Sequence, residues 1–249
     1  MQNYIAVSEI SKEILNSATL LKSLGVNALI IGQEGVGKKE LASYIIPHTK
    51  IYEAKELQVD INDNVITINN ESIIINNIEN ITNIELFINW SVKNDIRVIA
   101  TSTKQELNPK LQDFFSINID IPPLDQRKED IKPLANKFAL EAGKVLGTPN
   151  KPEKLIINTS QNAHSLRKSI YFSYLFESIG ESEIMMLMEN FILSNLEGEN
   201  SYRDLEYLFE APLLRASQKK YKSQLQMAKH LGLNRITLRK KLEVHKDLL

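Results

Sequence analysis

The sequence predicts an α/β protein with a parallel sheet in its first half and helices in its second. Three observations lead to this prediction. Short apolar runs alternate with possible helices up to residue 122, a glycine-rich loop follows the first run, and β-like runs nearly stop after Pro122 and Pro123. Short apolar runs separated by helices are typical of buried parallel strands.

The predicted strands are the four apolar runs at residues 27–31, 73–75, 97–100 and 117–121. Together with the intervening helices they form a first domain, residues 1–122. A second domain, residues 123–198, is predicted to be a helical lid with helices at residues 130–144, 160–178 and 182–195. A polar break then precedes a third domain, residues 199–249, which is helical and basic.

Composition narrows the class of protein. The 249-residue chain is 43% hydrophobic and 24% charged, which is typical of a soluble globular protein. No stretch approaches the roughly 18 apolar residues of a membrane span, and the N-terminus lacks a signal-peptide pattern. We therefore expect a cytoplasmic protein with no membrane partner. The chain has no cysteine and four scattered histidines, which excludes disulfide scaffolds, thiolate chemistry and Cys/His zinc sites.

The net charge of −1 hides an uneven distribution. Residues 215–249 contain ten of the 30 lysines and arginines but only two of the 31 acidic residues, so this tail carries +8 and the rest of the chain −9. Such an asymmetry is typical of an anion-binding module joined to an acidic body. The tail is either a nucleic-acid-binding module or a solvated basic helix.

The glycine-rich loop lies between the first predicted strand and a helical stretch at residues 40–46. Its Gly-x4-Gly-Lys pattern suits phosphate binding, because glycines let backbone N–H groups surround phosphate oxygens and Lys38 adds positive charge. Lys39 replaces the Ser or Thr that holds magnesium, which makes a magnesium site doubtful. The loop either binds ATP or ADP or is vestigial. Its candidate binding residues are Gly32, Glu34, Gly35, Val36, Gly37, Lys38 and Lys39.

Three segments resemble motifs of the AAA+ module of NtrC-type activators of sigma-54 RNA polymerase. Residues 32–39 are similar to GESGTGKE, residues 96–103 to the sensor I strand VRIIAATN, and residues 121–131 to LPPLRERxEDI. The residue after the lysine in GESGTGKE also has no hydroxyl, so Lys39 is not by itself a departure from this family. The resemblance implies an AAA+ P-loop domain followed by a helical lid. Residues 165–170 stand where the family has NVRELEN, which makes Arg167 the sensor II arginine that contacts the nucleotide from the lid.

The residues that this family uses for hydrolysis are replaced. Asn76 and Asn77 stand where the family has Asp-Glu, and amides can neither act as a base nor supply negative charge for magnesium. Thr103 replaces the sensor I asparagine, and residues 104–115 contain no arginine finger. The GAFTGA loop that contacts the sigma factor is absent, because no glycine lies between Gly37 and the second predicted strand. The resemblance therefore implies an ATPase that is inactive or nearly so, without catalytic residues.

The tail predicts a helix-turn-helix. Helices are expected at residues 202–221, 223–231 and 235–244, with a tight turn at 232–234. Four side chains are expected to point inward and hold the two short helices together: Ala228, Leu233, Leu238 and Leu242. This segment resembles the helix-turn-helix of Fis, which implies binding to double-stranded DNA; a structural hairpin with a basic face is the alternative. The residues expected to contact DNA are Asn234, Arg235, Ile236, Thr237, Arg239, Lys240 and Lys241.

Fis-type domains pair through their long helices, so the resemblance implies a homodimer formed by the C-terminal domain. Leu205, Leu208 and Phe209 are the candidate interface, unless they pack on the lid. The methionine-rich residues 185–188 favour a core helix over a partner surface.

Three functions stay open. The first is a DNA-binding transcriptional regulator with a degenerate AAA+ body that does not remodel sigma-54 polymerase. The second is an unorthodox but active AAA+ ATPase that activates sigma-54 transcription. The third is an interaction protein that modulates another AAA+ regulator, and RNA polymerase is a further candidate partner. The replaced hydrolytic residues favour the first function.

Overall fold

The computed structural model describes residues 4–148 and 151–249. The chain forms two compact units, Met1–Ser178 and Ile179–Leu249. The second unit begins before helix α8 (Glu181–Asn195), so α8 belongs with the C-terminal part and not with the lid expected at residues 123–198. The expected boundary after residue 122 lies inside the first unit, and the separation into two subdomains there stays a prediction.

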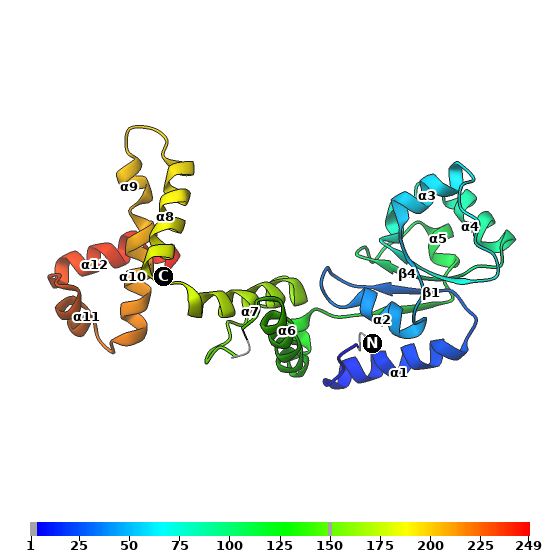
Figure 1. Ribbon diagram of the computed structural model, residues 1–249, viewed down its shortest axis with the longest axis horizontal. Helices are drawn as coiled ribbons and strands as arrows, with labels where there is room; N and C mark the ends of the chain where they lie inside the picture. Colours follow the sequence, from blue (N-terminus) through cyan, green and yellow to red (C-terminus); the bar gives the residue numbers. More distant parts are fainter. Residues whose placement is uncertain (1–3, 149–150) are drawn as a thin grey trace. The chain divides into compact units, whose positions relative to one another are not determined.

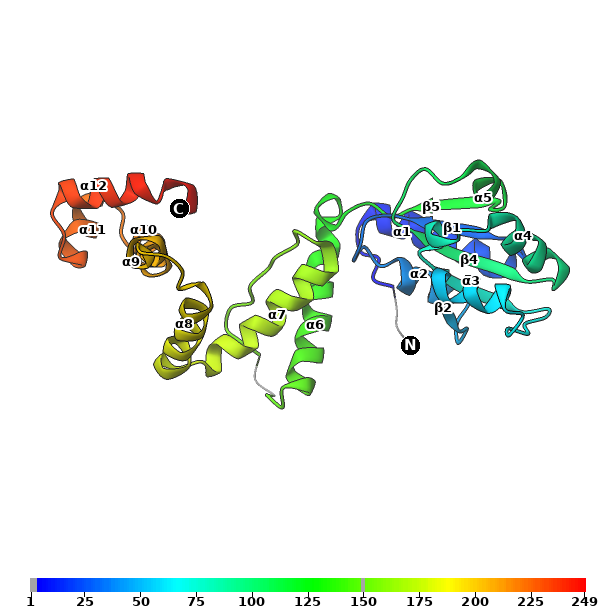
Figure 2. The same ribbon diagram turned by 90° about the horizontal axis from the view of Figure 1, so that it is seen from above.

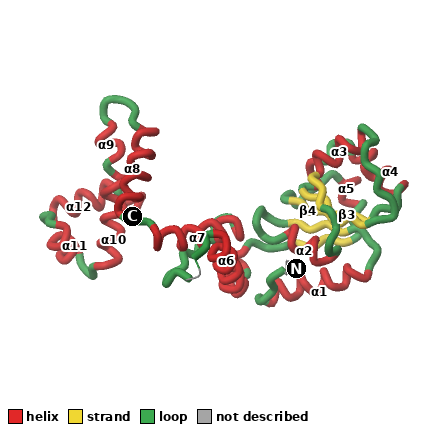
Figure 3. Tube along the Cα trace, in the orientation of Figure 1, coloured by secondary structure: helices red, strands yellow, loops and turns green. Residues whose placement is uncertain are grey.

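The first unit is built on a five-stranded sheet in which all neighbouring strands are parallel (Figures 1 and 3). The strand order is β2-β3-β4-β1-β5. The strands are β1 (Ala28–Ile31), β2 (Ile51–Glu53), β3 (Ser72–Asn76), β4 (Arg97–Ser102) and β5 (Ile117–Asp120). The predicted α/β class with a parallel sheet is confirmed.

Helices cover both faces of this sheet (Figure 1). They are α1 (Glu9–Ser23), α2 (Lys38–Ile45), α3 (Ala54–Asn62), α4 (Ile84–Lys93) and α5 (Pro109–Asp113). Helices α1 and α2 pack on one face, and α3, α4 and α5 pack on the other. Alternate strand residues point to opposite faces, so Ile74 joins the first core while Ile73 and Ile75 join the second. Burial on both faces explains why the inner strands are continuous apolar runs.

The sequence does not predict β2. This strand is three residues long and lies at the edge of the sheet, and its first residue, Ile51, is 39% exposed. It therefore lacks the apolar run that marks the inner strands. Its parallel register with β3 places Glu53 opposite Asn76, where both strands end.

Two further helices complete the first unit, α6 (Ile131–Val145) and α7 (Asn162–Ser178). They pack against each other through an apolar core of their own, and Figure 2 shows them side by side. The Tyr174 hydroxyl donates a hydrogen bond to the Ala139 carbonyl at 2.7 Å, which joins α7 to α6 inside this core. Two of the three helices expected after residue 123 are therefore present in this unit.

The described part of the second unit is helical. After α8 come α9 (Ser201–Leu205), α10 (Tyr207–Lys220), α11 (Gln224–Leu231) and α12 (Arg235–Val244). A small core joins α10, α11 and α12 through Leu214, Met227, Ala228 and Leu238, with Leu233 and Leu242 packed against it. The four inward side chains expected from the sequence lie where they were predicted. Gly232 ends α11 in the left-handed conformation, with φ 66°.

The single helix expected at residues 202–221 is wrong, because α9 and α10 share this range. The interruption lies at Glu206, whose backbone keeps a right-handed helical conformation. Pro212 lies inside α10 and has no N–H to donate to the carbonyl four residues earlier, which weakens the hydrogen-bond ladder just after the interruption.

The core helix expected around residues 185–188 is also wrong, because α8 buries none of its side chains. Met185 and Met186 are 63% and 60% exposed. α8 has 15 residues. No helix within the described ranges is long and apolar enough to cross a membrane.

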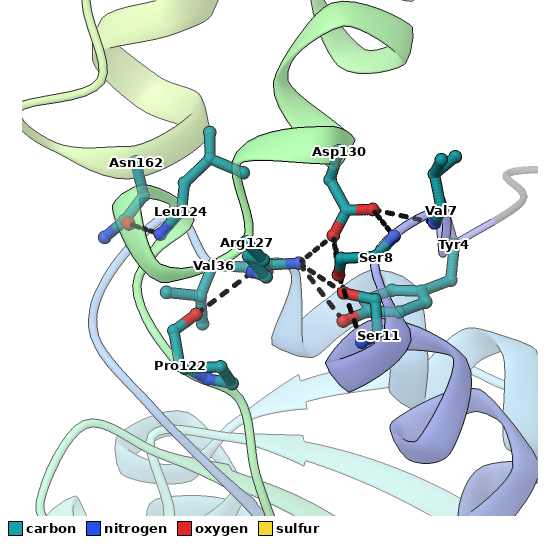
Figure 4. Close-up of polar contacts among 10 residues, drawn as sticks. All are labelled: Tyr4, Val7, Ser8, Ser11, Val36, Pro122, Leu124, Arg127, Asp130 and Asn162. Carbon is teal, nitrogen blue, oxygen red and sulfur yellow. Dashed lines mark hydrogen bonds and ion pairs between the residues drawn. The ribbon is translucent and has the colours of Figure 1, made fainter.

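A buried ion pair fixes the N-terminal segment to the start of α6 (Figure 4). Arg127 and Asp130 approach to 3.6 Å, with side chains 3% and 0% exposed. One oxygen of Asp130 accepts the backbone N–H groups of Val7 and Ser8, at 2.7 and 2.8 Å. The other accepts the hydroxyls of Ser8 and Ser11, at 3.0 and 2.5 Å. The carboxylate is therefore fully hydrogen-bonded, although it has lost contact with water.

Arg127 extends this network to two loops. Its guanidinium donates to the carbonyls of Val36, at 2.6 Å, and Pro122, at 3.1 Å. It also donates to the Tyr4 hydroxyl at 3.3 Å. The glycine-rich loop, the segment after β5 and the N-terminus are thus joined through one side chain.

Replacing Asp130 with Asn should destabilise the first unit, because it leaves the buried Arg127 guanidinium without its anion. We expect the free energy of unfolding to fall by about 3 to 5 kcal/mol. Urea denaturation followed by the fluorescence of Trp90, the single tryptophan, measures this unit. Glu129→Gln is the matched control, since Glu129 is a neighbouring acid that is exposed. Equal losses for the two variants would contradict the role of the pair.

The same carboxylate should make stability depend on pH. Burial alone would raise the pKa of Asp130, but hydrogen bonds from Ser11, Ser8 and Val7 outweigh burial and hold it below its usual value. A lowered folded pKa means that the stabilisation is complete above the unfolded value, about 3.9, and is lost as pH falls through the folded value. Wild type should therefore lose this contribution below about pH 4, whereas Asp130→Asn should show a weaker acid dependence.

Candidate functional site

A cavity of about 430 Å³ lies in the first unit, where the glycine-rich loop meets the carboxyl ends of β3 and β4 and helices α6 and α7. Its apolar lining includes Tyr4, Ile5, Leu134 and Phe138. Its polar and glycine lining includes Glu34, Gly35, Gly37, Lys38, Lys39, Asn76, Asn77, Thr103 and Arg167. A cavity lined by apolar side chains together with a basic, glycine-rich loop suits a ligand that joins an aromatic ring to phosphates.

The loop has the backbone that phosphate binding requires. Gly35 and Gly37 have φ of 74° and 103°, and Gly37 begins helix α2. A Cβ at Gly35 would lie 2.8 Å from Cδ2 of His164 and 2.9 Å from the Gln161 carbonyl oxygen, so only glycine fits there. The first residues of α2 consequently line the cavity with N–H groups that have no partner within the helix.

Lys38 lies within the loop that it serves. Its ammonium donates to the carbonyls of Gly32 and Gln33, at 2.6 and 2.8 Å. Burial lowers the pKa of Lys38, and the negative charges of Glu79 and Glu34 oppose this effect. An incoming phosphate would add the anion that this buried ammonium lacks.

Helix α7 holds the loop from the other side. The backbone N–H of Ala163 donates to the Gly35 carbonyl at 3.0 Å. The Asn162 amide donates to the Glu34 carbonyl at 2.9 Å, and its oxygen accepts the Leu124 N–H at 2.7 Å. The sequence gives no local signal for Asn162, because its partners are 38 or more residues away.

The candidate nucleotide residues are brought together with one exception. Glu34, Gly35, Val36, Gly37, Lys38, Lys39 and Arg167 all line the cavity. Gly32 does not line it and instead supports Lys38 through its carbonyl. Arg167 is 3.4 Å from Glu141 on α6, so the expected sensor II arginine lies at the cavity wall within an ion pair.

The amides after β3 are held by their neighbours. The nitrogen of Asn76 donates to both carboxylate oxygens of Glu53, at 2.9 and 2.7 Å, while its oxygen accepts the Thr101 hydroxyl at 2.8 Å. Lys39 pairs with the same Glu53 carboxylate at 3.2 Å. Glu53 is a site residue that sequence reasoning missed, because its position depends on the register of a strand with no apolar run.

Glu79 is a second acid that sequence reasoning left out. One of its oxygens accepts the backbone N–H and the hydroxyl of Thr103, at 3.0 and 2.6 Å. The other is buried and has no hydrogen-bond partner among the described residues. Burial alone would raise the pKa of Glu79, but the Thr103 hydrogen bonds outweigh it and lower the pKa. A carboxylate therefore lies beside the predicted sensor I residue, outside the register of the Asp-Glu motif.

The candidate DNA residues lie on and before α12. Asn234, Arg235, Ile236, Arg239 and Lys240 are exposed, and Thr237 is half-buried. The Asn234 side chain caps the helix by accepting the Thr237 N–H at 2.7 Å. Lys241 differs from the others because it forms ion pairs with Glu206 and Glu210, and its hydrogen bond to Glu210 raises the pKa of Lys241. The sequence predicts Lys241 as a DNA contact but does not reveal these acidic partners.

No protein-family model and no curated protein matches the chain. Solved structures of NtrX from Brucella abortus are similar to it. The ADP complex gives a TM-score of 0.59 at 13% identity and covers 98% of this chain and 69% of that chain. The ATP complex gives 0.57 at 14% identity, with 97% and 68% covered. These matches show that the chain has an AAA+ P-loop fold.

Replacing Asn162 with Ala tests whether α7 holds the loop. The variant leaves the buried Leu124 N–H without its acceptor and puts alanine at φ 53°. We expect the free energy of unfolding to fall by about 1 to 3 kcal/mol in urea denaturation followed by Trp90 fluorescence. The adjacent, exposed Gln161→Ala should change it by less than about 0.5 kcal/mol. If the two variants unfold alike, the loop does not depend on Asn162.

Proposed function

We propose that this protein is a DNA-binding transcriptional regulator whose degenerate, NtrC-type AAA+ body binds ATP or ADP without hydrolysing it. The observation that carries the proposal is the meeting, in one cavity, of an intact phosphate loop with two amides at the carboxyl end of β3. The loop supports binding, and the amides argue against turnover.

Nucleotide binding is supported by the mixed apolar and basic lining of the cavity. Tyr4, Ile5 and Phe138 offer an apolar surface for a base, while Lys38 and the α2 N-terminus offer charge and N–H groups for phosphates. The solved NtrX structures hold ADP and ATP, which supports the same ligands here.

The amides at the carboxyl end of β3 argue against hydrolysis. Water attack on a phosphate needs a group that orients the water and positive charge that stabilises the transition state. Asn77 has a neutral amide and therefore no carboxylate that could accept a proton from water. The nitrogen of Asn76 donates hydrogen bonds to Glu53. We therefore propose that bound nucleotide acts as a ligand that sets the arrangement of the domains.

DNA binding is supported by α11, the turn at Gly232 and α12, which have the order and lengths of a helix-turn-helix. Arg235, Arg239 and Lys240 project from α12 without an ion pair in the described chain, so their charges are available to phosphates or guanine. Ile236, 72% exposed, offers an apolar contact for a thymine methyl.

We further propose that the protein acts as a homodimer through its C-terminal unit. Phe209 is 65% exposed on α10, and Leu205 and Leu208 are half-buried beside it. Such a surface also suits another AAA+ regulator or RNA polymerase, in which case the protein would act by mixed assembly.

An active ATPase is the second candidate, and Glu79 favours it. One oxygen of its carboxylate accepts the Thr103 hydroxyl, and the other is buried without a hydrogen-bond partner among the described residues. The negative charge of Glu79 also acts to raise the pKa of Lys38. A carboxylate there could orient water in place of the missing Asp-Glu pair.

Calorimetric titration of the purified protein with ADP and ATP tests nucleotide binding. Lys38→Ala should weaken both by about 10- to 100-fold, because it removes a charge-assisted contact to phosphate. The exposed Lys55→Ala on α3 is the control and should bind as wild type does. No heat of binding for wild type would remove the nucleotide from the proposal.

A phosphate-release assay on the same samples separates the two candidates. The proposal expects release from ATP no faster than in a blank without protein. Release that is lost in both Lys38→Ala and Glu79→Gln would establish the active ATPase instead.

Replacing Arg239 with Ala tests the DNA interface. Affinity for duplex DNA should fall, and the slope of its logarithm against that of salt concentration should decrease by about one, because one phosphate contact is lost. Lys246→Ala is the control, since Lys246 is an exposed lysine beyond α12 that pairs with Glu243. Fluorescence anisotropy over a range of salt gives both quantities. An Arg239 variant with unchanged affinity and slope would refute binding through this face.

A further inference from the structure

The charges at the carboxyl end of β3 differ from those of a magnesium site. P-loop proteins hold the ion with a hydroxyl after the loop lysine and a carboxylate after the neighbouring strand. In this chain Lys39 follows the loop lysine and Asn76 ends β3, and both line the cavity. A positive charge and a neutral amide thus replace the two protein ligands.

The orientation of the Asn76 amide follows from its partners. A carboxylate only accepts hydrogen bonds, so the atom within 2.7 and 2.9 Å of the two Glu53 oxygens must be the nitrogen. The amide oxygen then accepts the Thr101 hydroxyl. An aspartate at position 76 would face Glu53 with like charge at the same separation, so asparagine at 76 and glutamate at 53 fit each other.

These residues do not fit magnesium. Glu53, the carboxylate hydrogen-bonded to Asn76, already accepts the hydrogens of that amide and the Lys39 ammonium. A divalent cation would have to displace that ammonium and withstand the positive charge of its side chain.

We infer that the cavity takes its nucleotide as a metal-free anion, and that Lys39, positioned by Glu53, supplies the positive charge that a divalent cation would otherwise bring. The inference rests on the proposed binding of ADP or ATP. In the Lys39–Glu53–Asn76 cluster the carboxylate lies at the end of β2, opposite Asn76 at the end of β3, and an ammonium side chain follows the loop lysine.

Calorimetry of the full chain with ADP, in excess MgCl₂ and in EDTA, tests this inference. Wild-type dissociation constants should agree within about twofold between the two buffers. Lys39→Ala should weaken binding in EDTA by about tenfold, because the ammonium is lost. Binding by wild type that is at least about tenfold tighter with magnesium would overturn the inference while leaving nucleotide binding intact. No binding in either buffer would overturn the proposed nucleotide function as well.

A variant with exchanged charges tests whether magnesium dependence can be gained. Lys39→Thr, Glu53→Gln and Asn76→Asp together return a hydroxyl and a carboxylate to the two ligand positions and keep an amide opposite the carboxylate. This variant should bind ADP at least about tenfold more tightly with magnesium, and Mn²⁺ added with ADP should give a bound-ion EPR signal that wild type lacks. The control variant, Lys55→Thr with Glu56→Gln, changes two exposed residues of α3 and should behave as wild type does. A folded swap variant without metal dependence, or bound Mn²⁺ in wild type, would overturn the assignment.

Discussion

The buried pair of Arg127 and Asp130 is the constraint on which the first unit depends. Arg127 contacts the phosphate loop through Val36, and Asp130 holds the backbone of residues 7–8. A buried ion pair adds little net stability over apolar side chains, because both charges lose their water. Its effect is geometric instead. Its donors and acceptors are all satisfied only when the N-terminal segment, the loop and the start of α6 meet, and that meeting forms a wall of the cavity.

The polar side chains at the end of β3 likewise depend on one another for their hydrogen bonds. Considered alone, Asn76 stands where the NtrC-type motif that the sequence resembles has an aspartate. Considered with Glu53 and Lys39, it is one of three side chains whose hydrogen bonds complete each other. Reverting position 76 alone would place two carboxylates within hydrogen-bond distance, which raises the pKa of one of them and does not restore a metal site. The departures from the hydrolytic pattern are therefore coupled, and they describe a site with a different charge arrangement.

Much of the fold could be predicted from the sequence, because its signals are local. The inner strands are apolar runs, the phosphate loop is a glycine pattern, and the core of α10 to α12 follows helical periodicity. The missed features depend on distant partners. The β2–β3 register places Glu53 opposite Asn76. The role of Asn162 depends on its hydrogen bond to the loop, and the ion pairing of Lys241 depends on an acid on α10. A sequence pattern gives the direction of a helical side chain but not the residues that it meets. For the same reason it does not reveal whether a helix is buried: the apolar side chains of α8 predict a core helix, but none of them is buried.

A site that binds nucleotide without turnover constrains how it can regulate. Hydrolysis lets an ordinary AAA+ protein pass through its states in one direction, whereas a non-hydrolysing site responds only to which nucleotide is present and at what concentration. Nucleotide can then change DNA affinity only through its different affinities for two arrangements of the protein, and DNA must change nucleotide affinity by the same factor. Arg167 suits such coupling, because it lies on α7 at the cavity wall and pairs with Glu141 on α6. If Arg167 left Glu141 to bind an incoming phosphate, the contacts between α7 and α6 would change. Under the proposed function, the lid and not the phosphate loop is the element whose position reports the ligand.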